Sequence, residues 1–557
     1  MEEVLLTGIR AKDDIPVTFT NVSRQDLTPR NLGQDIPILL NYLPGVVTTS
    51  DAGAGIGYTG IRVRGSDATR VNVTINGIPY NDSESQGTFW VNLPDFASSV
   101  ETIQLQRGVG TSTNGSAAFG ASLNLETDAV QNKAFASLSS SIGSFNSIKN
   151  TVRFSTGKIN KAFTFSGRLS QINSDGYIDR ASSDLDAYFF QGTFQDESTL
   201  IKALVFGGQE ITYQAYWGID AVTLQTNRTY NTAGEIYDEN GNRTGFYDNE
   251  VDNYNQEHYQ FHWNERLNSN WNFTLGLNYT HGRGFYEQYN DLWYDQNIEF
   301  SGATSFDYLQ LNPFSVGDIT VSNSENISQK WLDNDYYVVT LGLNFNTGST
   351  SLNFGGLYSR YVGDHFGDLI WGQSIGDAVP RHRFYENQGI KKEGNFFAKG
   401  TQTISEGLTA FVDLQFRSIA YQVSGQVAGP VPFLVDDDFL FFNPKAGLTY
   451  KVASRQKLYF SYAKAQREPN RTDYENGNPK PEKLDDFELG WRINTPKIKA
   501  QTNIYWMEYK DLLVLTGAID AVGSPIRQNV GKGRRLGIEL DMKMNLNSTW
   551  LWQPNNA

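Results

Sequence analysis

"IRVRGSDATRVNVTINGIPY", residues 61–80, holds two short segments in which apolar and polar residues alternate. Residues 61–64 and 71–75 have the period of two that is typical of half-buried strands. Asn76-Gly77 predicts a tight turn after the second segment, and an arginine stands at each end of the polar link between the segments. The stretch therefore predicts a small sheet with charged hinges, and more than four hundred residues follow it.

The composition favours strands with one apolar and one wet face. Aromatic residues make up 13% of the 557 residues, yet the mean hydropathy is −0.45. No long apolar run predicts a membrane-spanning helix, but alternation along strands lets a transmembrane barrel hide its apolar face. The net charge of −15 argues against a nucleic-acid partner. The chain has no cysteine and begins without an export signal, so an exported form would need a longer precursor.

The chain divides into two regions near residue 131. Residues 13–130 contain short strands, Gly-rich turns and a helix predicted over residues 31–45, which together indicate a compact α+β domain. Residues 131–557 contain about sixteen alternating segments of roughly ten residues, the length of a tilted strand that crosses a bilayer. In two of these segments we expect the following side chains to face lipid: Trp271, Phe273, Leu275, Leu277, Tyr337, Val339, Leu341 and Leu343.

The connections between these segments decide the architecture. Tight turns alternate with long connections, such as residues 209–255 and 282–334. An outer-membrane barrel has short turns on one side and long loops on the other. A sandwich has no reason to alternate them, and no internal repeat supports a propeller or a solenoid. We therefore predict a mainly β fold, a transmembrane antiparallel β-barrel preceded by the α+β domain.

Further motifs follow the opening stretch. They are "VETIQLQRGVGTSTNGSAAFGASLNLET" (residues 100–127), "AQREPN" (residues 465–470) and "NPKPEKLDDFELGW" (residues 478–491). In this order they resemble the plug and the late-barrel signature of TonB-dependent outer-membrane receptors. The resemblance implies that residues 13–130 are a plug inside the lumen of a barrel that has about 22 strands in the family. It also implies location in the bacterial outer membrane, contact with outer-membrane lipid, and the energy-coupling protein TonB as a partner.

The resemblance assigns roles to residues of the plug motifs. The expected turn residues are Gly65, Asn76, Gly77 and Gly108. The residues expected in a buried charged cluster between plug and barrel are Arg64, Arg70, Glu101 and Arg107. Buried charges need partners, and water can replace each partner when the plug moves. The alternative is that some of these residues lie on a solvated strand face.

The first residues, "EEVLLTGIRA", resemble a TonB box. We expect residues 1–12 to form the box and a linker, with the box itself made by Glu3, Val4, Leu5, Leu6 and Thr7. Such a segment adds as a strand to the sheet of a periplasmic partner. Outside the family context, three apolar residues near a terminus would indicate an ordinary edge strand.

Ligand contact is expected from plug loops at the outer end of the lumen, in residues 80–90 and at the turn near residue 114. Aromatic side chains there could stack on a planar small-molecule ligand, and polar ones could form hydrogen bonds. The candidates are Tyr80, Asp82, Glu84, Gln86, Phe89, Trp90 and Asn114. The alternative is that they pack against the barrel loops.

No residue pattern predicts catalysis, a resident cofactor or a metal site. His258 and His262 are expected to face the lumen as wall residues. The sequence has no GxSxG, HExxH or Cys-His motif. We therefore expect no enzymatic activity.

The leading functional hypothesis is TonB-dependent active transport of a scarce nutrient, above all a ferric siderophore or similar metal chelate. The alternatives are import of cobalamin, an oligosaccharide or a peptide, and a surface binding or adhesion barrel that does not transport. About sixteen strands against 22 in the family also lead us to expect truncation at the C-terminus. The first barrel strand, near residues 134–142, should then not pair with the last, near residues 536–546.

Overall fold

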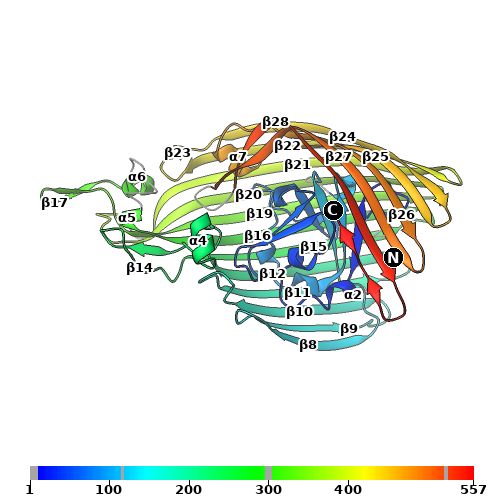
Figure 1. Cartoon of the computed structure of the whole chain (residues 1–557), viewed down its shortest axis with the longest axis horizontal. Coiled ribbons are helices and arrows are strands. Elements are labelled where there is room, and N and C mark those ends of the chain that lie inside the picture. The colour runs from blue at the N-terminus through cyan, green and yellow to red at the C-terminus, as the bar shows by residue number, and fades with distance from the viewer. Residues whose placement is uncertain (1–9, 115–117, 295–303, 380, 520–524) are drawn as a thin grey trace.

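The computed structural model describes residues 10–114, 118–294, 304–379, 381–519 and 525–557. A small N-terminal domain, the plug, lies inside a curved wall of long antiparallel strands (blue in Figure 1). Within these residues, no helix has the length and apolar content that crossing a bilayer requires.

The plug is built on a five-stranded sheet in the order β1-β6-β7-β4-β5. Its strands are β1 (Phe19–Ser23), β4 (Val71–Ile75), β5 (Ile78–Pro79), β6 (Val100–Arg107) and β7 (Ala121–Thr127), and a separate hairpin pairs β2 (Val46–Ser50) with β3 (Thr59–Val63). β4 and β7 are parallel, and the other neighbours are antiparallel. Val73, Ile75 and Leu123 are fully buried in the core of the plug, where their burial supplies the hydrophobic stabilisation.

The predicted turn residues of the plug lie at turns. Asn76 and Gly77 have φ of 53° and 84°, and two successive positive values give the turn whose twist suits a hairpin. Gly65 and Gly108 have φ of 70° and 79°. A Cβ at Gly108 would lie only 2.5 Å from a barrel carboxylate oxygen, so a side chain there would displace the contact between plug and barrel.

The helices of the plug are shorter than predicted. They are α2 (Arg24–Leu27), α3 (Ile36–Leu39) and the 3-10 turns η1 (Ala68–Arg70), η2 (Trp90–Asn92), η3 (Phe96–Ser99) and η4 (Ser112–Asn114). The prediction of one helix over residues 31–45 is wrong in extent, because Gly33 has φ of 133° and Asp35 caps the helix in an extended conformation. Leu32 is consequently exposed, whereas Ile36 is buried.

The wall contains nineteen strands in the described residues, of which three are only two residues long. The sixteen long strands agree with the predicted number, but seven of them span 20 to 24 residues rather than roughly ten, so they extend into stretches predicted as long connections. In order they are β8 (Ala134–Ile142), β9 (Ile148–Thr156), β10 (Phe163–Ser174), β11 (Ser183–Gln195), β12 (Thr199–Tyr213), β15 (Val251–Arg266), β16 (Trp271–Asn290), β19 (Asn326–Asn346), β20 (Thr350–Gly372), β21 (His382–Ser405), β22 (Leu408–Val427), β24 (Val435–Ala453), β25 (Gln456–Arg467), β26 (Glu482–Asn494), β27 (Ile498–Ile519) and β28 (Pro525–Asn545).

The long connections carry small elements of their own, which project at one end of the wall (left in Figure 1). They are α4 (Ala221–Thr226), the pair β13 (Glu235–Tyr237) and β14 (Arg243–Phe246), α5 (Leu292–Tyr294), α6 (Ser305–Leu309), the pair β17 (Phe314–Val316) and β18 (Ile319–Val321), β23 (Val431–Pro432) and α7 (Arg471–Glu475).

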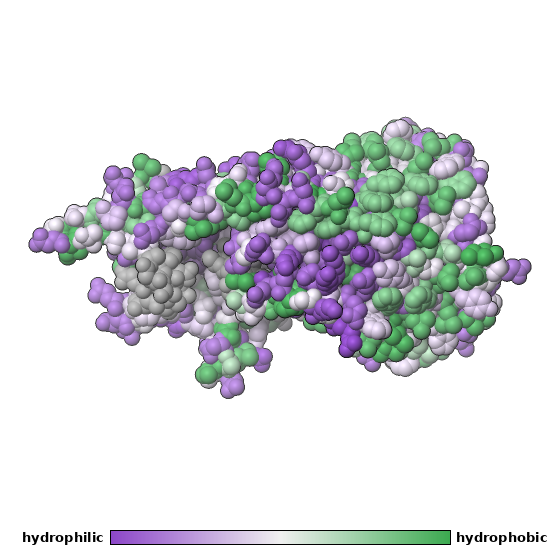
Figure 2. Space-filling model, turned by 90° about the horizontal axis from the view of Figure 1, so that it is seen from above, coloured by the Kyte–Doolittle hydropathy of each residue, from purple (hydrophilic) through white to green (hydrophobic). Residues whose placement is uncertain are grey.

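The predicted apolar face points away from the lumen. None of the eight residues expected to face lipid is buried, and Leu277, Tyr337, Val339 and Leu341 are exposed. Asn278, next to Leu277, is buried on the inner side. Green residues cover much of the wall on the right of Figure 2, whereas purple residues are more frequent in the middle and on the left. A protein in water avoids such a surface, whereas a bilayer matches it.

The two ends of the wall are not direct neighbours. β8 pairs with β9, and β28 pairs with β27 and, over two residue pairs each, with β29 (Leu551–Trp552) and β30 (Asn555–Asn556). The strand order places β29 and β30 between β28 and β8. In the described part of the chain no ladder joins β8 to β28.

Candidate functional site

A cavity of about 390 Å³ lies at the end of the lumen that carries the long connections, and we call it the vestibule. Its floor is the apical loop of the plug, residues 80–90, and its walls are the ends of β15, β16, β19 and β20 together with α7. Its aromatic lining consists of Tyr58, Phe89, Tyr254, Phe285, Tyr286, Tyr308, Trp331 and Tyr385. Its volume and lining are typical of a small-molecule site.

The seven candidate ligand residues separate into different environments. Asp82 and Phe89 line the vestibule, and ligand contact remains a prediction for these two. Asn114 ends η4, and its side chain is outside the described part of the chain.

The other four candidates pack against protein, as the alternative interpretation allowed; three of them are buried and Tyr80 is half-buried. Trp90 is 1% exposed in the core of the plug. The Tyr80 hydroxyl donates to Gln256 on β15 at 3.1 Å. Gln86 donates to Glu468, and Glu84 bonds to several barrel groups.

Glu84 fastens the apical loop to the barrel. Its carboxylate is 2.7 Å from Nε2 of His365, accepts a hydrogen bond of 2.7 Å from the Tyr421 hydroxyl, and pairs with Arg471 at 3.1 Å. Burial acts to raise the pKa of Glu84, but the charges of His365 and Arg471 outweigh it and hold the pKa well below its usual range. Glu84 is therefore an ionised anchor, with partners on β20, β22 and α7.

The late-barrel motif "QREPN" makes a second set of contacts with this loop. Glu468 accepts from Gln86 and from Lys391, and Lys391 also donates to the Ser83 carbonyl at 2.8 Å. The Asn470 side chain donates to the Ser85 carbonyl at 3.0 Å. Sequence reasoning identifies this motif but cannot assign its target, because loop and motif are nearly four hundred residues apart.

A cluster of buried charged residues joins the plug to β26 and β28. Arg64 pairs with Glu488 and, at 2.9 Å, with Glu539, while Arg107 lies 3.3 Å from Glu539. Burial acts to lower the pKa of Arg64, but the two carboxylates keep it above its ordinary value.

Arg70 makes a separate set of ion pairs with β26. It pairs with Asp67 of the plug and, at 2.6 Å, with Glu482 of β26, which also pairs with Arg467 at 2.7 Å. Arg64, Arg70 and Arg107 are all below 5% exposed. The prediction that these three arginines are buried and paired is therefore confirmed by their geometry.

Glu101 does not belong to this cluster, and its assignment there is corrected. It is half-exposed and pairs with Arg24 of the plug itself at 3.3 Å. The interface between plug and barrel contains instead a carboxylate that the motif did not indicate, Asp95, which binds Lys149 of β9 and Arg168 of β10. Lysine and arginine together hold the pKa of the buried Asp95 down at about 2, against the effect of burial.

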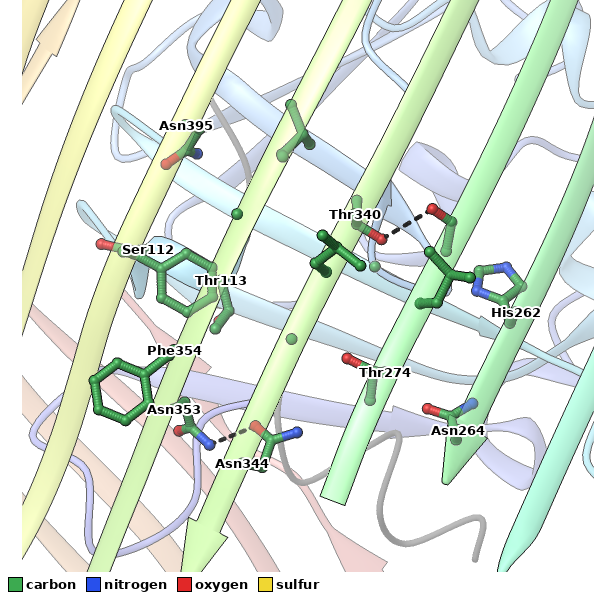
Figure 3. Close-up of a pocket in the computed structure, with 18 of the residues that line it drawn as sticks. Ser112, Thr113, His262, Asn264, Thr274, Thr340, Asn344, Asn353, Phe354 and Asn395 are labelled. Carbon is green, nitrogen blue, oxygen red and sulfur yellow. Dashed lines mark hydrogen bonds between the residues drawn. The ribbon is translucent and has the colours of Figure 1, made fainter. Parts of the chain in front are cut away.

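A smaller cavity of about 90 Å³ lies lower down, between the plug and the same arc of wall, β15 to β21. Figure 3 shows polar side chains of this arc, such as His262, Thr340 and Asn395, around Ser112 and Thr113 of the plug. His258 and His262 face inward, as expected, and each is 3% exposed. In the described residues, no three His, Cys, Asp or Glu side chains are grouped to hold a metal.

A wall of antiparallel strands with an apolar outer face, blocked by a domain that salt bridges hold, defines the class of plugged outer-membrane barrels. The chain belongs to the TonB-dependent receptor family. The family model "TonB dependent receptor-like, beta-barrel" matches residues 216–556, and "TonB-dependent Receptor Plug Domain" matches residues 11–122. Members of this family are outer-membrane β-barrels of Gram-negative bacteria. The predicted TonB box, Glu3 to Thr7, lies outside the described residues.

Solved structures of the same fold are similar at low sequence identity. The ferric citrate transporter FecA is 14% identical with a TM-score of 0.71, over 96% of this chain and 75% of that one. The ferric yersiniabactin uptake receptor FyuA from Yersinia pestis is 14% identical with a TM-score of 0.67, over 97% and 78%. The ferric-catecholate import receptor Fiu from E. coli K12 is 15% identical with a TM-score of 0.69, over 97% and 80%. No curated protein sequence matches the chain.

Proposed function

We propose that the chain is a transporter rather than an enzyme, and that it imports a ferric siderophore or a similar metal chelate across the bacterial outer membrane with energy from TonB. The vestibule carries this proposal, because His365 and Arg471 line it and also bind Glu84 of the plug. A ligand that contacts these two residues changes the contacts that hold the apical loop, so occupancy of the vestibule is coupled to the plug. FecA, FyuA and Fiu are each a transporter or receptor of a ferric chelate, which supports this ligand class.

Deleting residues 2–7 tests the coupling to TonB. Uptake of a radiolabelled ferric chelate by cells should fall to background, while binding of the same chelate to the cells remains, because all the described residues that line the vestibule are kept. Replacing Leu5 by Pro should have the same effect as the deletion, since it removes a backbone donor from an added strand. Leu5→Ala keeps that donor and serves as the control.

Four outcomes are distinguishable. Loss of uptake with retained binding supports TonB-coupled import. Unchanged uptake in the deletion variant rejects the coupling, and binding without uptake in the unaltered chain indicates a surface receptor that does not transport. If no ferric chelate binds but cobalamin, an oligosaccharide or a peptide does, the ligand class is wrong and the architecture stands.

A further inference from the structure

We infer that the vestibule selects a chelate without net negative charge, such as a neutral or cationic ferric hydroxamate. This inference rests on the proposed import of a metal chelate and narrows its class. Three features of the described residues carry it: two of the three basic side chains that line the vestibule are already paired, two of its three carboxylates accept hydrogen bonds from uncharged groups, and its aromatic lining favours positive charge.

The vestibule offers little free positive charge to an anion. The basic residues of its lining are Lys330, His365 and Arg471. His365 is 2.7 Å from Glu84, and Arg471 lies 3.1 Å from Glu84 and 2.8 Å from Glu475. An anionic ligand would have to displace these carboxylates, which leaves a buried negative charge without partners and is costly. Lys330 alone, among the described basic residues of the lining, makes no ion pair.

Two of the three carboxylates that line the vestibule accept hydrogen bonds from uncharged donors, whereas the third pairs with Arg471. Asp82, Asp252 and Glu475 line it. Asp252 accepts a hydrogen bond from Tyr58, and Asp82 accepts from the backbone amides of residues 84 and 85, so neither has a cation as its partner in these contacts. Burial, reinforced by the neighbouring Glu84, raises the pKa of Asp82. A cation on the ligand would stabilise the ionised form of this group.

The connections at the mouth of the vestibule add to this negative field. The described residues of the connections 214–250 and 291–325 contain six and four Asp and Glu residues, against two and no Lys and Arg residues. Charge of one sign around an opening raises the local concentration of the opposite sign and repels its own. An anionic chelate therefore meets repulsion before it reaches the cavity.

The aromatic rings act in the same direction. Eight rings line the vestibule, and five of them belong to tyrosine. The face of an aromatic ring is electronegative, so it attracts ammonium and guanidinium groups. These rings offer the organic part of a chelate a large apolar contact, and this contact does not require negative charge on the chelate.

The common ferric chelates differ in charge by chemistry alone. Each hydroxamate carries one negative charge, so three of them neutralise ferric iron, and an ammonium on the backbone makes the complex cationic. Each catecholate carries two, so three of them leave a strongly anionic complex. The vestibule therefore suits the hydroxamate class, whereas Fiu is a ferric-catecholate import receptor.

The test compares three iron complexes of different charge on outer membranes that contain the full chain: cationic ferrioxamine B, neutral ferrichrome and anionic ferric enterobactin. We expect binding of ferrioxamine B or ferrichrome, and at least ~10-fold weaker binding of ferric enterobactin, since one close charge contact is worth about that factor. Tightest binding of ferric enterobactin would overturn the charge inference and leave the proposed function intact. Binding of none of the three overturns the proposed function, and the charge inference falls with it.

Two variants locate the effect in the vestibule. Asp82→Asn keeps an oxygen for the backbone amides, and Glu475→Gln keeps the shape of its side chain, yet each removes a negative charge. Each should weaken binding of ferrioxamine B about 5- to 10-fold and leave ferrichrome within ~2-fold. Glu406→Gln, on the exposed tight turn between β21 and β22 and outside both the vestibule and its long connections, is the matched control. Equal losses for the cationic and the neutral complex would contradict a charge effect.

Discussion

At the scale of single residues, Glu482 is the group on which two buried arginines converge. One of its oxygens accepts from Arg70 at 2.6 Å and the other from Arg467 at 2.7 Å, and the side chain is 0% exposed. Glu482→Gln should leave both guanidinium groups short of negative charge, and removing one partner of a buried pair costs about 3–5 kcal/mol. We expect limited proteolysis to cut the plug of this variant faster than the plug of the unaltered chain. Glu508→Gln, on β27 with one hydrogen bond to Trp506, is the control, and equal resistance in both variants would contradict the prediction.

The sequence predicts the plug residues of these ion pairs but not their partners on the barrel. Arg64, Arg70 and Arg107 stand in recognisable motifs, but their partners on β26 and β28 are about four hundred residues away, and alternation alone does not say which carboxylates face the lumen. The motif misplaces Glu101 because its partner is Arg24, within the plug. The sequence predicts Glu84 as a ligand residue, whereas its ion pairs depend on loops that the sequence cannot position.

At the scale of elements, the plug meets the wall in two different ways. β26 and β28 hold it by ion pairs, whereas the arc of β16 and β19 faces it with small polar residues and a cavity. A Cβ on Gly276 of β16 would lie 2.5 Å from the Thr340 hydroxyl and 3.6 Å from Ile78 of the plug. Gly276→Leu should therefore destabilise the protein by about 1–3 kcal/mol through overpacking. The fall in the midpoint temperature of thermal unfolding in detergent measures this loss of stability.

Gly394 of β21 is the matched control, because a Cβ there meets nothing within 4 Å. Gly394→Leu should unfold within a few degrees of the unaltered chain. An equal loss in both variants would show that strand propensity, rather than the fit between plug and wall, is responsible.

The elements themselves are predictable to different degrees. The sixteen long strands follow from alternation and from tight turns, both of which are local signals. The short helices of the plug do not, because Gly33 and Pro37 restrict α3 to one turn within an apolar stretch that would otherwise continue.

At the scale of the whole molecule, the outer face decides whether the chain belongs in a bilayer. Leu341 lies on β19 within the apolar face and is 51% exposed. An arginine on the lipid face of a barrel costs about 2–4 kcal/mol near the middle of the bilayer and far less at its edges. Leu341→Arg should therefore lower the free energy of unfolding by that amount. It should also lower the yield of folding into lipid vesicles. Ile319→Arg is the control, because Ile319 is 71% exposed on β18, in a long connection away from the wall. Equal tolerance of both substitutions would mean that the apolar face does not contact lipid.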